Sequence, residues 1–154
     1  MHMPATALFS DRHSAHAAVE QLAQAGFARD EVSIVMSEDT HEREFGSSPS
    51  MRSGVRPAPS ANGILGALVA SLAPLQGPGG TSLRVGGPLL DAMLRAGALS
   101  AALFSLGMAE PSVRALREGL LGGNIMVGVH ASGERSSLAM QLLELAGGEA
   151  LQAA

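Results

Sequence analysis

The chain has 154 residues, a length typical of one domain. Hydrophobic residues make up 46% of it, charged residues 16% and aromatic residues 3%. This composition excludes an intrinsically disordered chain and a nucleic-acid binder that stacks bases on aromatic rings. The formal net charge is −4, every basic residue is Arg, and neither Lys nor Cys occurs. Schiff-base lysines, P-loop lysines, thiolate nucleophiles, zinc ribbons and disulfides are therefore excluded.

Residues 1–37 predict a strand, a helix and a second strand. Residues 5–10 form a short apolar run, and Asp11 after them is a good N-cap. Apolar residues then recur at helical spacing as far as Gly26, a residue type that commonly ends helices. The alternation over residues 32–36 is typical of a strand. We expect no secretory signal, because the start has neither a basic region nor a long apolar one.

Residues 122–154 repeat this plan. Residues 125–131 are strand-like, an apolar stripe then indicates a helix that ends at Gly147, and residues 149–153 predict a last short strand. A constant offset (147 − 26 = 121) aligns Gly26 with Gly147 and Leu22 with Leu143 without a gap. Two βαβ halves in tandem predict a ferredoxin-like α+β fold, an antiparallel sheet with both helices on one face.

The middle of the chain differs in composition. Residues 38–61 are polar and turn-rich, and they predict a flexible linker. Residues 62–121 are apolar and predict helices inserted between strands two and three, the last of them opening at Glu110-Pro111. The apolar run over residues 64–75 is too short for a bilayer span, which needs about 20 residues. Asp91 and Arg95 weigh against a span in the longer segment, residues 85–107, so we expect a helical hairpin buried by self-association.

Small residues recur four apart within the segment 85–107. On one helix, Gly97, Ala101 and Ser105 would form a ridge that lets another helix approach closely. Leu90 and Leu94 mark an apolar stripe of the same segment. We expect self-association or lipophilic contact at these residues: Leu65, Leu68, Leu72, Leu90, Leu94, Gly97, Ala101 and Ser105.

No pattern predicts a catalytic or metal site. His13 and His16 share a helix face but lack a third ligand, and His130 is expected near the opposite end of the sheet. Residues 77–82 are glycine-rich but have no P-loop lysine. The acidic residues of the linker lie in a polar segment, whereas paired catalytic carboxylates need a desolvated pocket. We therefore expect no enzyme activity, no cofactor, no metal and no nucleic-acid partner.

Several stretches together carry a family resemblance. They are Ser10-Asp11-Arg12, Gly26-Phe27, Val85-Gly86-Gly87-Pro88-Leu89, Gly107-Met108 and Gly122-Gly123-Asn124-Ile125. On these residues the chain resembles the heat-induced general stress protein family of the seventeen-M type, over about residues 5–148. The resemblance implies an α+β domain interrupted by a glycine- and alanine-rich helical segment. It implies no enzymatic activity and supplies no catalytic residue.

These observations favour one structural domain built from two βαβ halves, a linker and an inserted helical segment. We expect a non-enzymatic, stress-related or scaffold protein that forms a homo-oligomer through the insertion, driven by apolar burial worth about 25 cal/mol per Å². The alternative is a binding module or membrane-surface subunit whose insertion holds a lipophilic ligand such as a lipid or quinone. We expect a cytoplasmic protein, located peripherally at the membrane under the alternative.

Overall fold

The computed structural model describes residues 5–28, 31–45, 72–76, 82–131 and 134–151. These residues form an α+β fold, as the sequence predicts. The elements in chain order are β1 (Ala5–Phe9), α1 (Arg12–Gln24), β2 (Val32–Ser37), α2 (Glu38–Phe45), β3 (Ala73–Gln76), β4 (Ser82–Gly86), α5 (Pro88–Ala96), α6 (Leu99–Ser105), α7 (Glu110–Leu121), β5 (Ile125–Val129), α8 (Glu134–Leu145) and β6 (Glu149–Leu151).

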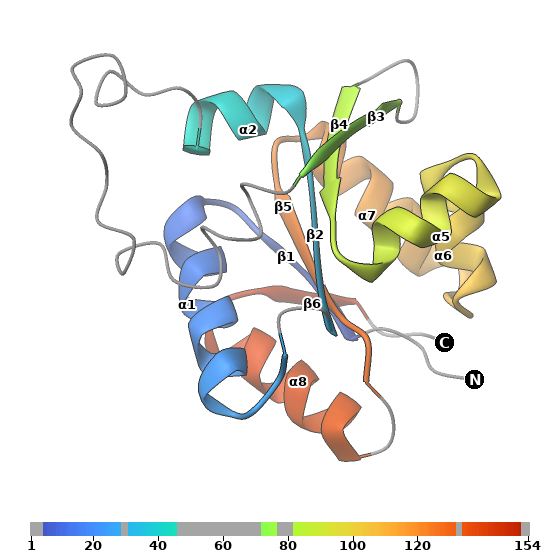
Figure 1. The fold of residues 1–154 in the computed structure, drawn as a ribbon. Helices are drawn as coiled ribbons and strands as arrows, with labels where there is room; N and C mark the ends of the chain where they lie inside the picture. The colour runs from blue at the N-terminus through green and yellow to red at the C-terminus, as the bar shows by residue number, and fades with distance from the viewer. Residues whose placement is uncertain (1–4, 29–30, 46–71, 77–81, 132–133, 152–154) are drawn as a thin grey trace.

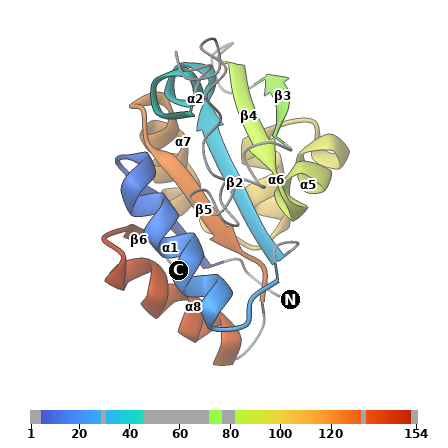
Figure 2. The same ribbon diagram turned by 60° about the vertical axis from the view of Figure 1, so that its left-hand side comes forward.

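The strands form one sheet in the order β3-β4-β2-β5-β1-β6, and every neighbouring pair is antiparallel. Helices cover both faces of this sheet, so the molecule has three layers. Figures 1 and 2 show α1 and α8 on one face and α5, α6 and α7 on the other. The sheet therefore separates two apolar cores.

The first core lies under α1 and α8. Strands β1, β2 and β5 direct alternate residues toward these helices, such as Phe9, Ile34 and Val127, and all three are buried. The two helices pack small and branched residues, at helical spacing, against these strands: Ala15, Ala18, Val19 and Leu22 from α1, and Ala139 and Leu143 from α8. The alternation over residues 32–36 separates the two faces of β2, but Ser33 and Val35 are buried as well, because helices also cover the opposite face of the sheet.

Both helices of this layer end in the same way. Beyond α1, Gly26 adopts a positive φ of 98°, and the N–H of Phe27 donates to the carbonyl of Leu22. Beyond α8, Gly147 has a φ of 97°, and the N–H of Gly148 donates to the carbonyl of Leu143. This left-handed termination is what a glycine at that position permits. The helix stops expected at both glycines are confirmed.

The second core lies under α5, α6 and α7. The sheet contributes Leu8, Val35, Leu83, Val85 and Met126 from its opposite face. The helices contribute buried residues from every turn: Leu89, Met93, Leu99, Ala102, Leu103, Val113, Leu116 and Leu120. Much of the apolar insertion therefore packs over its own sheet.

Three expectations for the middle of the chain need correction. Residues 62–121 are not wholly helical, because β3 and β4 form a hairpin that extends the sheet beyond β2. The first residues of the expected linker form α2, whose acidic first turn and Arg43 in its last turn suit the helix dipole. The ridge of small residues expected on one helix is also wrong, because α5 ends before Gly97 and a new helix, α6, begins at Leu99.

Two positive-φ glycines bound α5. Gly97 (φ 87°, ψ −10°) is its left-handed C-cap and stands in open space. Gly87 (φ 89°, ψ −167°) precedes α5 where the chain presses against β2. A Cβ at Gly87 would lie 2.2 Å from the carbonyl oxygen of Val32 and 2.7 Å from the Cα of Ser33. Only glycine fits this junction between helix and sheet.

Candidate functional site

The expected contact residues fall into three groups in the structure. Leu65 and Leu68 lie outside the described residues. Leu72 is 9% exposed and belongs to the core under α1 and α8, and Leu90 is half-buried beside the other core. The remaining four lie on the surface of α5, α6 and the turn between them.

These surface residues, together with Phe104, are here called the α5–α6 patch: Leu94, Gly97, Ala101, Phe104 and Ser105. The Leu94 side chain is 62% exposed and that of Phe104 is 48% exposed, while the three small residues are also exposed. Because α6 begins anew after Gly97, the three small residues do not form the ridge on one helix that the sequence suggested. Sequence reasoning missed Phe104, although an aromatic residue three places after Ala101 in an apolar segment was a usable signal.

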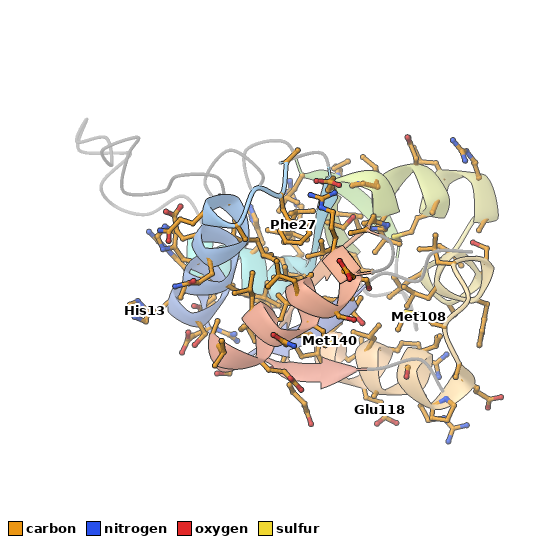
Figure 3. All side chains as sticks on the ribbon, turned by 90° about the horizontal axis from the view of Figure 1, so that it is seen from below. His13, Phe27, Met108, Glu118 and Met140 are labelled. Carbon is orange, nitrogen blue, oxygen red and sulfur yellow. The ribbon has the colours of Figure 1, made fainter. Side chains whose placement is uncertain are left out.

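Two cavities of the described residues are lined mainly by charged side chains. One of about 330 Å³ lies between α6 and α7 and is bounded by Phe104, Val113 and the charged residues Glu110, Arg114 and Arg117. Arg114 donates to Glu110 at 2.8 Å within this wall. Figure 3 shows Met108 in the turn between these two helices. The mainly charged lining does not suggest a site for a purely apolar ligand.

The larger cavity, about 630 Å³, lies where α1 begins and α2 ends, and is lined by Asp11, Arg12, His13, His16 and Glu44. Its carboxylates are already engaged. Asp11 accepts the N–H of Ser14 at 2.8 Å, and this hydrogen bond lowers the pKa of Asp11. Glu44 accepts the N–H of Arg12 at 2.8 Å, and that bond lowers its pKa likewise. Ionised, hydrogen-bonded carboxylates are poor candidates for proton transfer near neutral pH.

The two helix histidines of this cavity do not complete a metal site. Figure 3 shows His13 pointing away from the body of the protein. Within the described part of the chain, no group of three or more potential metal ligands comes together. His16 faces Glu20 one turn along α1, with 3.9 Å between Nε2 and Oε2.

A buried polar bridge lies between β2, the end of β5 and the start of α5. The Ser33 side chain is fully buried, and its Oγ lies 2.8 Å from Nε2 of His130. The same Oγ accepts the N–H of Leu89 at 2.9 Å. Burial lowers the pKa of His130. The sequence signal was a Ser inside an apolar strand and a His just after another, but only the strand pairing brings them together.

Ion pairs hold the periphery of the fold. Arg84 of β4 makes two hydrogen bonds to the carboxylate of Glu38, which lowers the pKa of Glu38 and ties α2 to the added hairpin. Arg135 of α8 pairs with Glu31 at 2.7 Å and lies 4.6 Å over the ring of Phe27. The hydrogen bonds from Arg135 and from the N–H of Ala28 lower the pKa of Glu31 to about 2.

Comparisons with family models, with curated proteins and with solved structures find no match to this chain. Among the described residues, no helix has the length and apolar character needed to cross a bilayer.

Proposed function

We propose that this chain is a non-enzymatic, stress-related or scaffold protein that self-associates through the α5–α6 patch. One observation carries the proposal: Leu94 and Phe104 remain 62% and 48% exposed on a helical pair whose other large apolar residues are buried or half-buried. Large exposed apolar side chains on adjoining helices are typical of contact surfaces when they form one patch. Their neighbours Gly97, Ala101 and Ser105 are small and let another backbone approach closely.

The proposed contact is narrower than the whole insertion. The core under α5–α7 already buries Leu89, Met93 and Leu103, so these residues do not drive association of the folded protein. In a two-fold dimer, burying both copies of Leu94 and Phe104 contributes about 4–6 kcal/mol. Lost translational and rotational freedom costs about 4–15 kcal/mol. The gain from these two residues does not exceed that cost, so the homo-oligomer we propose is weak and depends on further burial around Gly97, Ala101 and Ser105.

The finer fold assignment is also a proposal. We propose a ferredoxin-like core formed by β1, α1, β2, β5, α8 and β6, to which the β3–β4 hairpin is added at one edge. Its support is the order β2-β5-β1-β6 with α1 and α8 on one face. Membership of the general stress protein family rests on the sequence resemblance, and so does the stress-related role. A cytoplasmic location is likewise part of the proposal.

Sedimentation equilibrium over rising concentration tests the self-association. Phe104→Glu places a charge in the patch, and we expect it to remain a monomer while the wild-type mass increases. Leu145→Glu is the matched control, because Leu145 is 82% exposed on α8, across the sheet from the patch. Equal masses for all three proteins at every concentration would contradict the proposal. Flotation of the wild type with phosphatidylcholine vesicles, lost in Phe104→Glu, would favour the lipophilic alternative instead.

A further inference from the structure

The hydroxyl group of Ser33 acts as a helix cap supplied by another element. The N-cap of α5 is Gly87, which has no side chain, and Pro88 at the first turn has no N–H. The next amide, that of Leu89, is the first that needs an acceptor, and it donates to Oγ of Ser33 on β2. Ser33 of the sheet therefore accepts the N–H that the side chain of a Ser, Thr or Asp at the N-cap position usually accepts.

The positions of the protons follow from this arrangement. Oγ accepts the amide proton of Leu89, so its own proton is free to be donated to the facing Nε2 of His130. Among the described residues, the Oγ of Ser33 makes no hydrogen bond besides these two. The Ser33 hydroxyl and Nε2 of His130 are both satisfied when His130 is neutral and carries its proton on Nδ1. A proton added to His130 must go to Nε2, and the hydroxyl proton of Ser33 is then left without an acceptor in a buried place.

The surroundings of His130 also disfavour the imidazolium. Burial lowers its pKa, and the positive end of the α5 dipole points toward the bridge. The charged groups on the adjoining segments do not compensate. The Glu31 carboxylate is paired with Arg135, and Asp91 in the first turn of α5 is exposed, as is Glu134 at the start of α8.

We propose that Ser33 and His130 form a proton-sensitive clamp that holds the start of α5 on β2 while His130 is neutral and loosens it when His130 is protonated. The device is independent of self-association. Gly87 makes the clamp sensitive to geometry, since its backbone lies directly against Val32 and Ser33. Loosening acts first on α5, whereas α7 is held by its own buried residues Val113, Leu116 and Leu120.

The clamp should change over the pH range in which histidine titrates. Unperturbed His titrates near pH 6.5, and a lowered pKa places the change below that value. The pKa values of Glu31, Glu38, Glu44 and Asp11 are all lowered, so these carboxylates stay ionised above about pH 5. His41, whose pKa burial also lowers, is on α2, which packs mainly on β2 and β4.

Amide hydrogen exchange, read by NMR between about pH 7.5 and pH 5, tests the clamp. The background carries Phe104→Glu, so association does not affect the result. We expect protection of the α5 amides, corrected for intrinsic exchange rates, to fall about five- to tenfold as pH falls, the range expected for loss of a cap. Protection of the α7 amides should stay constant. The midpoint should coincide with the titration of the His130 ring protons.

Two variants and a control separate the clamp from general acid destabilisation. His130→Gln offers an amide oxygen to Ser33 that does not titrate, and it should abolish the pH dependence while leaving α5 protected. Ser33→Ala should leave α5 poorly protected at every pH. His13→Gln, at an exposed position on α1, should behave as the background does. Parallel loss of α5 and α7 protection, or a pH dependence that survives in His130→Gln, would overturn the proposal.

Discussion

Gly87→Ala tests the packing of α5 on the sheet most directly. The substitution adds one methyl group where φ is 89° and ψ is −167°, a region that L residues almost never occupy. It also sets a Cβ 2.2 Å from the carbonyl oxygen of Val32. That oxygen belongs to a buried central strand, so relief must come from movement of α5 outward. Movement would stretch the 2.9 Å hydrogen bond from Leu89 to Ser33.

The expected cost combines three effects. Backbone strain costs about 1–3 kcal/mol, the weakened hydrogen bond about 1 kcal/mol, and overpacking about 1–3 kcal/mol. We expect the free energy of unfolding to fall by about 3–7 kcal/mol. Gly97→Ala is the matched control, because Gly97 has nearly the same φ, 87°, but nothing lies within 4 Å of its added Cβ. Its cost is the left-handed strain alone, about 1–2 kcal/mol.

Urea unfolding followed by circular dichroism measures the difference, since the chain has neither Trp nor Tyr for fluorescence. In both variants the unfolding free energy should depend on urea concentration with the wild-type slope. The urea concentration at the unfolding midpoint should be much lower for Gly87→Ala than for Gly97→Ala. Equal midpoints for the two variants would refute the close approach of α5 to β2.

The same unfolding assay applies to Leu116→Ala, which empties a fully buried position under α7 and should cost about 2–5 kcal/mol. Leu121→Ala, at a 50% exposed position of the same helix, should cost about 0.5 kcal/mol, and similar costs for the pair would contradict the assigned face of α7. Arg135→Ala removes the main cause of the lowered pKa of Glu31, which should rise from about 2 toward its ordinary 4.5. In the wild type the stabilisation from Glu31 is complete above pH 4.5 and is lost as pH falls toward 2. Carboxyl chemical shifts measure this, and an unchanged Glu31 titration in the variant would rule out the pairing.

The ends of the chain are predictable because their signals are local. Asp11 caps α1 as expected, and glycines end α1 and α8 where the pattern places them. The offset of 121 pairs residues with equivalent places, since Ala18 and Ala139 are both fully buried, and so are Leu22 and Leu143. Periodicity over three or four helical turns carries enough information for such predictions.

The middle is harder because its signals are short or depend on distant partners. The strand β4 alternates over only three positions, Leu83, Arg84 and Val85, and it is stabilised by pairing with β2 far away in sequence. The four-residue spacing predicts that Gly97 belongs to a small-residue ridge, whereas Arg95 before it gives the charge pattern of the helix end that the structure shows. Exposure of Leu94 and burial of Leu89 depend on how α5 lies over the sheet, and the hydropathy of these residues is the same.

The connection between β2 and β5 has a consequence for engineering. These strands are antiparallel neighbours, with Val35 opposite Met126, so the end of β2 and the start of β5 lie close together at one end of the sheet. A tight turn could join them, and the chain path would then skip residues 38–124 altogether. This shorter connection would expose Leu8, Val35 and Met126 to water, whereas they are buried in the intact protein. Residues 38–124 are therefore not needed to connect β2 to β5, but their helices α5, α6 and α7 cover an apolar face of the sheet. A shortened version of the protein would need polar residues on that face.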